Sequence, residues 1–369
     1  MTEQEKEVEE PVPKRVTISN DDLYRRSTQF ELWSFTQESL DKAKQKANKT
    51  GQLLAQERFN QAFNKSKSEN PELFERYKDD ELNPQTLITL LTYEEESKFI
   101  QFYCQNIVQT TDYFRMPTQV KLTAISLFKK FYLINSMMEY HPKNIMYTSV
   151  FLAAKSENYF ISIESFVQRL KDVKPSDILD LEFKILQSLK FTLLVHHAFR
   201  PLYGFFLDFQ AVLLHPSPLM YDVSVDTLGA LYDKAKIWLN ENAILSDVAF
   251  LFTPPQIALA AMYDVNRRVT DRYLKKKFLT TSAVHNDHEE IGDENEEPTN
   301  DDNNEIDDQI KSERNQYEIL VRTIRKCIRI SKQEKPTSEE SKEIDKRCKS
   351  ALSPDKVIER KIKKLTTSP

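Results

Sequence analysis

The sequence contains very little glycine. Gly51, Gly204, Gly229 and Gly292 are the only glycines among 369 residues, and each stands alone. Gly-rich phosphate loops and the sharp turn that carries a nucleophilic serine both need clustered glycines, because the backbone there adopts positive φ or approaches a ligand closely. The scarcity argues against a nucleotide-binding protein and against an α/β-hydrolase.

Cysteine is equally scarce. Cys104, Cys327 and Cys348 lie far apart and form no Cys-x-x-Cys pair, so neither a disulfide framework nor a zinc site is indicated. The adjacent His196 and His197 cannot face one metal from the same side of a helix or strand. We therefore predict no catalytic residues, no metal and no cofactor in this chain.

Long apolar runs are also missing. No run reaches the roughly 18 residues that a membrane span requires, and the first ten residues are acidic, unlike the basic start of a signal peptide. A soluble intracellular protein without membrane contact is expected.

The formal charge of −5 conceals an uneven distribution. Residues 280–308 hold twelve Asp and Glu and no Lys or Arg, whereas residues 309–369 hold seventeen Lys and Arg against nine Asp and Glu. The acidic segment is predicted to be a disordered insert, because it cannot bury enough apolar area to fold. The basic stretch could attract nucleic acid, but the acidic segment beside it opposes this, and solvated helix faces are the simpler explanation.

Helical periodicity is what the sequence has in abundance. Residues 1–18 are polar and are predicted to be disordered. Residues 19–91 are predicted to form an N-terminal helical extension. Its Tyr24 and Trp33 are large apolar side chains that a single helix cannot bury by itself, so this extension needs another surface to lie against.

Residues 92–195 predict a first compact unit of five helices. Thr92 and Glu95 have the spacing of a capping box, and Pro142 suits the first turn of the third helix. The third helix, residues 145–155, is apolar on nearly every side, which indicates that other helices surround it.

Residues 196–331 repeat this plan faintly. Pro254 begins another helix of small residues, 257–261, as a proline does in the first unit. The acidic segment falls between the fourth and fifth helices of this second unit, and residues 332–369 follow as a C-terminal helix and a basic tail. The prediction is an all-α protein with two consecutive five-helix repeats, flanked by N- and C-terminal helices.

Two charged residues lie where the periodicity predicts apolar surroundings. Glu182 comes three residues after Leu179 and four before Leu186, within an apolar stripe of the fifth helix. Lys155 follows Leu152 by three residues near the end of the third helix. A Lys and a Glu in apolar surroundings suit a docking surface with charge complementarity, and ordinary exposed helix ends are the alternative.

Several segments, in order along the chain, resemble the cyclin family and in particular its H-type branch. They are residues 33–35, 128–133, 135–142, 151–155, 181–183, 189–191, 199–201 and 253–259. The resemblance covers about residues 23–278 and resumes near residue 310. It implies the cyclin fold, which agrees with the two five-helix repeats expected from periodicity.

The resemblance implies a regulatory subunit that binds a cyclin-dependent kinase and is itself no enzyme. In the family, a Lys of the third helix and a Glu of the fifth contact the kinase, and these roles map onto Lys155 and Glu182. The family's apolar contact positions map onto Leu152, Leu186, Phe191 and Leu193. Tyr24 and Trp33 match the helix that precedes the cyclin box and are candidate further contacts.

The resemblance also implies the assembly and its location. The implied partners are a cyclin-dependent kinase catalytic subunit, a RING-finger assembly factor and the core of general transcription factor H, with no direct contact to nucleic acid. The implied role is support for phosphorylation of the RNA polymerase II C-terminal domain, and of other cyclin-dependent kinases, in the nucleus.

Two alternatives stay open. Another transcriptional cyclin, of the C, K or T kind, has the same fold, although residues 138–142 and the Trp33 segment favour the H type. A transcription factor of the B type uses a similar double repeat to hold DNA. That protein requires an N-terminal zinc ribbon, and this chain has no cysteine before Cys104.

Overall fold

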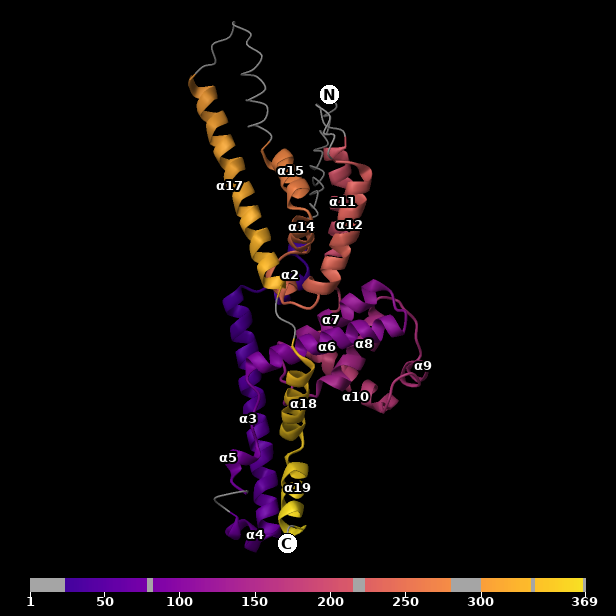
Figure 1. Ribbon diagram of the computed structural model, residues 1–369, viewed down its shortest axis with the longest axis vertical. Coiled ribbons are helices and arrows are strands. Elements are labelled where there is room, and N and C mark those ends of the chain that lie inside the picture. The colour runs from indigo at the N-terminus through magenta and orange to yellow at the C-terminus, as the bar shows by residue number, and fades with distance from the viewer. Residues whose placement is uncertain (1–23, 78–81, 215–222, 280–299, 333–335, 368–369) are drawn as a thin grey trace, which may run out of the picture.

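The computed structural model describes residues 24–77, 82–214, 223–279, 300–332 and 336–367 (Figure 1). Every regular element within these ranges is a helix, which confirms the predicted all-α class. None of the helices described there is both long and apolar enough to cross a membrane. The prediction for residues 1–18 lies outside the described residues.

The first repeat has α8 at its centre. Its helices are α6 (Tyr93–Tyr113), α7 (Thr118–Tyr132), α8 (Pro142–Ser156), α9 (Ile163–Val167) and α10 (Pro175–Ser188). The predicted capping box begins α6, where Thr92 N donates to Glu95 Oε2 at 2.8 Å. Within α8, Ile145, Val150 and Ala153 are all 0% exposed, so neighbouring helices surround it as predicted.

The second repeat follows the same plan around α14. Its helices are α11 (Phe199–Leu213), α12 (Val225–Trp238), α13 (Val248–Leu251), α14 (Pro254–Val265), α15 (Arg267–Phe278) and α17 (Asn300–Ser331), and a π-helical turn η1 (Leu239–Ala243) extends α12. The predicted disorder of residues 280–308 is wrong for residues 300–308, which form the first turns of α17. The packed remainder of α17 propagates the helix toward its N-terminal turns. Residues 280–299 lie outside the described residues.

Most of the helices outside the repeats form a stalk beside the first repeat (Figure 1). They are α3 (Gln37–Glu69), α4 (Pro71–Arg76), α5 (Pro84–Leu87), α18 (Ser338–Leu352) and α19 (Pro354–Thr367). The short α2 (Thr28–Trp33) lies apart from the stalk, near the junction of the two repeats. The predicted basic tail is an ordered helix, because α19 lies along α3 with Ile358 fully buried in one cluster with Phe59. Ile358, Ile362 and Leu365 recur at helical spacing and supply the apolar stripe that orders this helix.

The loop between α7 and α8 is held by α3 and α6. Gly51 of α3 lies so close to this loop that a Cβ there would meet Ser136 Oγ at 2.1 Å. Glu96 of α6 accepts hydrogen bonds from Ser136 Oγ at 2.5 Å and from Met137 N at 3.0 Å. Burial raises the pKa of Glu96, and these donors oppose that rise.

The two repeats are joined by buried polar contacts. Lys129 of α7 donates to the carbonyl oxygens of Ile244, at 2.7 Å, and Ser246, at 2.5 Å, in the second repeat. Lys44 of α3 pairs with Asp247 at 2.6 Å. These contacts fix the orientation of the repeats and leave the far ends of α8 and α10 uncovered by the second repeat.

Candidate functional site

Lys155 and Glu182, which the sequence singled out separately, form an ion pair on the first repeat. Lys155 Nζ, in the last turn of α8, lies 2.7 Å from Glu182 Oε1 and 2.9 Å from Oε2, in the middle of α10. The Lys155 ammonium also lies 4.6 Å from the centre of the Phe151 ring. The structure thus brings together two residues that are 27 positions apart in the chain.

Stability alone does not account for this pair. The Lys155 side chain is 48% exposed and that of Glu182 is 18% exposed. An ion pair open to solvent contributes roughly 0–1 kcal/mol to folding. The mutual contact instead holds both charged groups in one place, which reduces the ordering cost when a partner binds them.

Exposed apolar side chains surround the pair. Leu179 and Phe183 of α10 are 43% and 60% exposed, and Phe191 is 61% exposed. The rings of Phe183 and Phe191 meet edge to face with centroids 6.3 Å apart. Clustered exposed aromatics beside a charged pair are typical of a protein-binding surface. We call Lys155, Glu182, Leu179, Phe183 and Phe191 the α8–α10 face.

The backbone after α10 holds Phe191 on this face. Lys190 and Phe191 have φ angles of 52° and 58°, in the left-handed region that a bulky residue rarely adopts. The turn is closed by Phe191 N donating to the Leu186 carbonyl at 2.9 Å. Such backbone costs of the order of 1–3 kcal/mol and is concentrated at functional sites.

The predicted apolar contact residues differ in exposure. Phe191 is exposed, and Leu186 and Leu193 are partly buried beside the core. Leu152 is only 3% exposed and belongs to the core of the first repeat. Its role as a direct contact stays a prediction.

One exposed aromatic residue, Phe160, was not among the predicted site residues. Phe160 is fully exposed in the segment between α8 and α9. Its position follows from Asn158, whose φ of 56° turns the chain away from the core. An asparagine near the end of a predicted helix was the available signal, because Asn tolerates this conformation better than most residues.

The N-terminal residues make internal contacts. Trp33 is 3% exposed, and its Nε1 donates to Thr192 Oγ1 at 2.9 Å, so its indole packs within this chain. Its role as a further contact stays a prediction. Tyr24 is half-buried with its ring 5.5 Å from that of His196. Gln29 completes the contact by accepting from His196 N at 2.7 Å. The aromatic side chains of this segment therefore cover the junction between the repeats.

The two histidines, His196 and His197, pack at this junction. His197 Nε2 lies 2.9 Å from Thr123 Oγ1, and the Thr123 hydroxyl donates to Glu157 Oε1 at 2.6 Å. Because the hydroxyl has one proton, the Nε2–H of His197 donates to Thr123. Burial lowers the pKa of His197 to about 4, and the nearby positive charge of Lys130 adds to this effect.

A buried lysine lies beside the histidines. Lys130 is 2% exposed, and its Nζ has no hydrogen-bond partner among the described residues. It lies 5.4 Å from the centre of the Trp33 ring, and burial lowers its pKa to about 8. Among the described residues, no three His, Cys, Asp or Glu side chains gather as a metal site would require.

Two family models match the two repeats separately. The model for the N-terminal domain of cyclins matches residues 72–194, and the model for the cyclin C-terminal domain matches residues 197–332. The two matches meet at the junction that holds His196 and His197.

Three curated relatives extend this result. The chain is 39% identical over 269 residues to Cyclin CCL1 of Saccharomyces cerevisiae, which covers 72% of this chain and 64% of that protein, just under two thirds. It is 38% identical to Cyclin mcs2 of Schizosaccharomyces pombe, over 70% of this chain and 74% of the relative. It is 32% identical to Cyclin-H of Xenopus laevis, over 67% and 69%.

Two solved structures have a similar fold. One is the CAK complex of Chaetomium thermophilum bound to ATP-gamma-S, with a TM-score of 0.67, 26% identity, and coverage of 96% of this chain and 97% of that chain. The other is the yeast TFIIK complex of Kin28, Ccl1 and Tfb3, with a TM-score of 0.57, 31% identity, and coverage of 84% and 100%.

Proposed function

This chain belongs to the cyclin family, H-type relatives among its matches, and on that premise we propose that it is the regulatory subunit of a cyclin-dependent kinase in the kinase module of general transcription factor H. The observation that carries the proposal is the α8–α10 face, where a pre-positioned ion pair is surrounded by exposed aromatics. The similarity to chains from a CAK complex and a TFIIK complex supports the choice of assembly.

The α8–α10 face can activate a kinase without chemistry of its own. A protein kinase needs its active-site Lys paired with a Glu on a mobile helix, and it needs an ordered activation segment. A cyclin that binds only the state with this helix swung inward shifts the population toward that state, by as much as its affinities for the two states differ. In this proposal the chain stabilises an active conformation, and the kinase subunit performs every phosphoryl transfer.

The proposal includes the wider assembly. A RING-finger assembly factor and the core of general transcription factor H complete the complex, which phosphorylates the RNA polymerase II C-terminal domain and other cyclin-dependent kinases in the nucleus. Sequence identity of 39% and 38% to two fungal cyclins supports the H type over the C, K or T kind.

The test is activation of a purified cyclin-dependent kinase catalytic subunit from the same organism, with peptides of the polymerase C-terminal repeat as substrate. We expect the full chain to stimulate phosphorylation, and Phe183→Ser to weaken the chain's affinity for the kinase at least tenfold. Ile237→Ser is the matched control, because Ile237 is 55% exposed on the second repeat, compared with 60% for Phe183.

Failure of the wild-type chain to bind or activate the kinase would contradict the proposal. Binding to promoter DNA in the absence of any kinase would favour the B-type transcription factor instead. Equal losses of affinity for Phe183→Ser and Ile237→Ser would show that the binding surface has been placed wrongly.

A further inference from the structure

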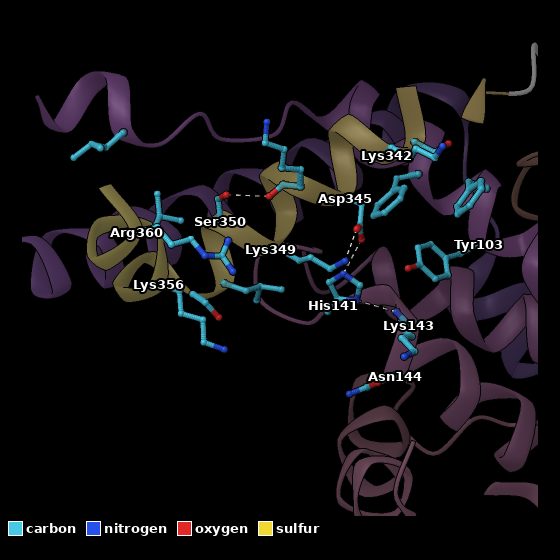
Figure 2. A pocket seen from close by; sticks show the side chains of 18 of the residues that line it. Tyr103, His141, Lys143, Asn144, Lys342, Asp345, Lys349, Ser350, Lys356 and Arg360 are labelled. Atoms are coloured by element: carbon cyan, nitrogen blue, oxygen red, sulfur yellow. Dashed lines mark hydrogen bonds and ion pairs between the residues drawn. The ribbon is translucent and has the colours of Figure 1, made fainter. Parts of the chain in front are cut away.

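A basic groove lies where α18 and α19 meet the first repeat (Figure 2). Its volume is about 1470 Å³. Half-buried apolar side chains contribute to its lining, among them Phe102 of α6, Leu352 of α18 and Val357 of α19. The groove is therefore large enough for a peptide segment and has apolar as well as charged walls.

The groove is strongly positive. Eight of its lining residues are Lys or Arg, and Asp345 is the only acidic one. The basic residues are Lys143, Lys342, Lys346, Lys349, Lys356, Arg360, Lys361 and Lys364. Such a concentration of one sign of charge in a concave surface attracts ligands of the opposite sign.

The sequences of α18 and α19 place these Lys and Arg residues on the side of each helix that lines the groove. Lys342, Lys346 and Lys349 recur at helical spacing along α18, and the series continues on α19 with Lys356 and Arg360. The acidic Asp355 and Glu359 lie on another face of α19, in a separate pocket, and the apolar stripe of α19 faces α3. The positive face is thus continuous along both helices.

The single carboxylate in the groove is already neutralised. Asp345 accepts from His141 Nε2 at 3.0 Å and pairs with Lys349 Nζ at 2.5 Å, as the dashed lines in Figure 2 show. Burial alone would raise the pKa of Asp345, but these two donors bring it below its ordinary value. No carboxylate among the described residues pairs with Lys342, Lys356 or Arg360.

The groove is held open by contacts that fix α18. Arg347 forms a two-pronged ion pair with Glu95 at the start of α6 and donates to the Leu90 carbonyl at 2.6 Å. Cys348 Sγ donates to the Met137 carbonyl at 3.2 Å. A site that is already formed before binding loses less free energy to ordering when a ligand enters.

We propose that this groove binds an acidic segment of another protein, one whose Asp and Glu side chains alternate with apolar anchors. The acidic residues meet the Lys and Arg side chains, and the apolar anchors meet Leu352, Val357 and Phe102. Nucleic acid fits less well, because two of the three aromatic rings in the lining are covered: Phe99 is 1% exposed and Tyr103 is 8% exposed.

The described start of the acidic segment, residues 300–308, lies far from the groove. These residues begin α17, whose 32 residues span about 48 Å, and the groove lies beyond the opposite end of that helix (Figure 1). The occupant is therefore assigned to a different molecule.

The groove is separate from the α8–α10 face. Lys143 lies in the first turn of α8 and Lys155 in the last, about 18 Å along the helix. The groove and the α8–α10 face therefore share no residue, and the test of the groove does not depend on the proposed kinase function.

The experiment measures binding of a fluorescent 20-residue peptide of alternating Glu and Leu blocks to the full-length chain by anisotropy. We expect Lys342→Glu, Lys356→Glu and Arg360→Glu together to weaken this binding at least tenfold. The matched control is Arg322→Glu, Lys326→Glu and Arg329→Glu, three exposed basic residues on α17, which should leave the affinity within twofold. Raising the salt concentration from 50 to 200 mM should weaken binding by roughly tenfold or less, because carboxylate contacts are few and screened.

Three further probes decide between occupants. Replacing every Glu of the peptide by Gln should remove at least nine tenths of the affinity. Tighter binding of a single-stranded oligonucleotide of equal charge would overturn the proposal, and so would tighter binding of a peptide of residues 280–308, which would assign the groove to a second copy of this chain. No detectable peptide binding, or equal loss in both triple variants, would overturn it as well.

Discussion

The two repeats share a central helix but end it differently. In α8 the dipeptide Ala153-Ala154 is followed by Lys155, whose side chain is 48% exposed. In α14 the dipeptide Ala260-Ala261 is followed by Met262, which is fully buried. The residue after the alanine pair is thus exposed in the first repeat and buried in the second.

Neighbouring contacts close the end of α14. Asp264 accepts from Trp238 Nε1 at 2.8 Å and from Lys332 Nζ at 2.9 Å, so its charge is satisfied within the repeat. Val321 and Ile324 of α17 are buried against the same core. The two repeats thus share a helical scaffold, and the residues of one helical turn decide whether the end of the central helix is exposed or closed.

Met262→Lys is expected to have the largest effect, because it places a charge in the core of the second repeat, where the native chain has none. Met262 is 0% exposed, so the new ammonium would have to lose its proton or open the core. We expect a loss of roughly 3 kcal/mol or more in the free energy of unfolding, measured by urea denaturation. A variant that unfolds at the wild-type urea concentration would show that this end of α14 is not closed.

Gly51→Ala would test how tightly α3 packs against the loop between α7 and α8 of the first repeat. A Cβ at Gly51 would clash with Ser136, and we expect a cost of roughly 2–3 kcal/mol. Gly229→Ala is the control in α12 of the second repeat, where no atom lies within 4 Å of the added Cβ. It should gain about 0.5–1 kcal/mol from helix propensity, and a loss in both variants would contradict this difference.

The acid sensitivity of the junction follows from His197. Its pKa of about 4 in the folded chain lies below the unfolded value of 6.5, so the unfolded chain takes up a proton first as the pH falls. Between pH 7 and pH 5 we expect this residue to remove about 2 kcal/mol of stability. Thermal unfolding of His197→Gln should be less pH-dependent than that of the wild type in this range. Parallel pH profiles for the two proteins would contradict the assignment.

Lys155→Met gives α8 the residue that follows the alanine pair in α14. Of these variants it should change the free energy of unfolding least. Because the Lys155–Glu182 pair is half-exposed, we expect a change within about 1 kcal/mol in the free energy of unfolding. Affinity for the kinase should nevertheless fall at least tenfold. A large loss of stability in calorimetry would mean that the pair serves the fold.

Local signals predicted much of the fold. The predicted start of α14 at Pro254 agrees with the structure, because proline and helical spacing lie within the segment itself. The order in α19 could also have been predicted, because Ile358 and Ile362 follow the same spacing. The many Lys and Arg residues between these apolar positions make that stripe difficult to recognise in the sequence.

The site was predictable in part. The neighbours of Lys155 and Glu182 in sequence revealed their apolar surroundings, but not the 2.7 Å contact between them, which depends on how α8 and α10 cross. The burial of Leu152 depends equally on that crossing. The basic groove depends on a contact between Arg347 and Glu95, 252 residues apart, which no local pattern indicates.

Reversing the two charges of the α8–α10 face, singly and together, tests the central claim most directly. Lys155→Glu and Glu182→Lys each remove one charge that the kinase would contact, whereas the double variant restores the internal pair with its polarity exchanged. The measurement is the dissociation constant for the purified kinase, with the thermal midpoint recorded for each variant.

We predict that each single reversal weakens kinase binding at least tenfold with the thermal midpoint nearly unchanged, and that the double variant remains as weak. Wild-type affinity in either single variant, or recovery of affinity in the double variant, would contradict the claim that these charges contact the kinase.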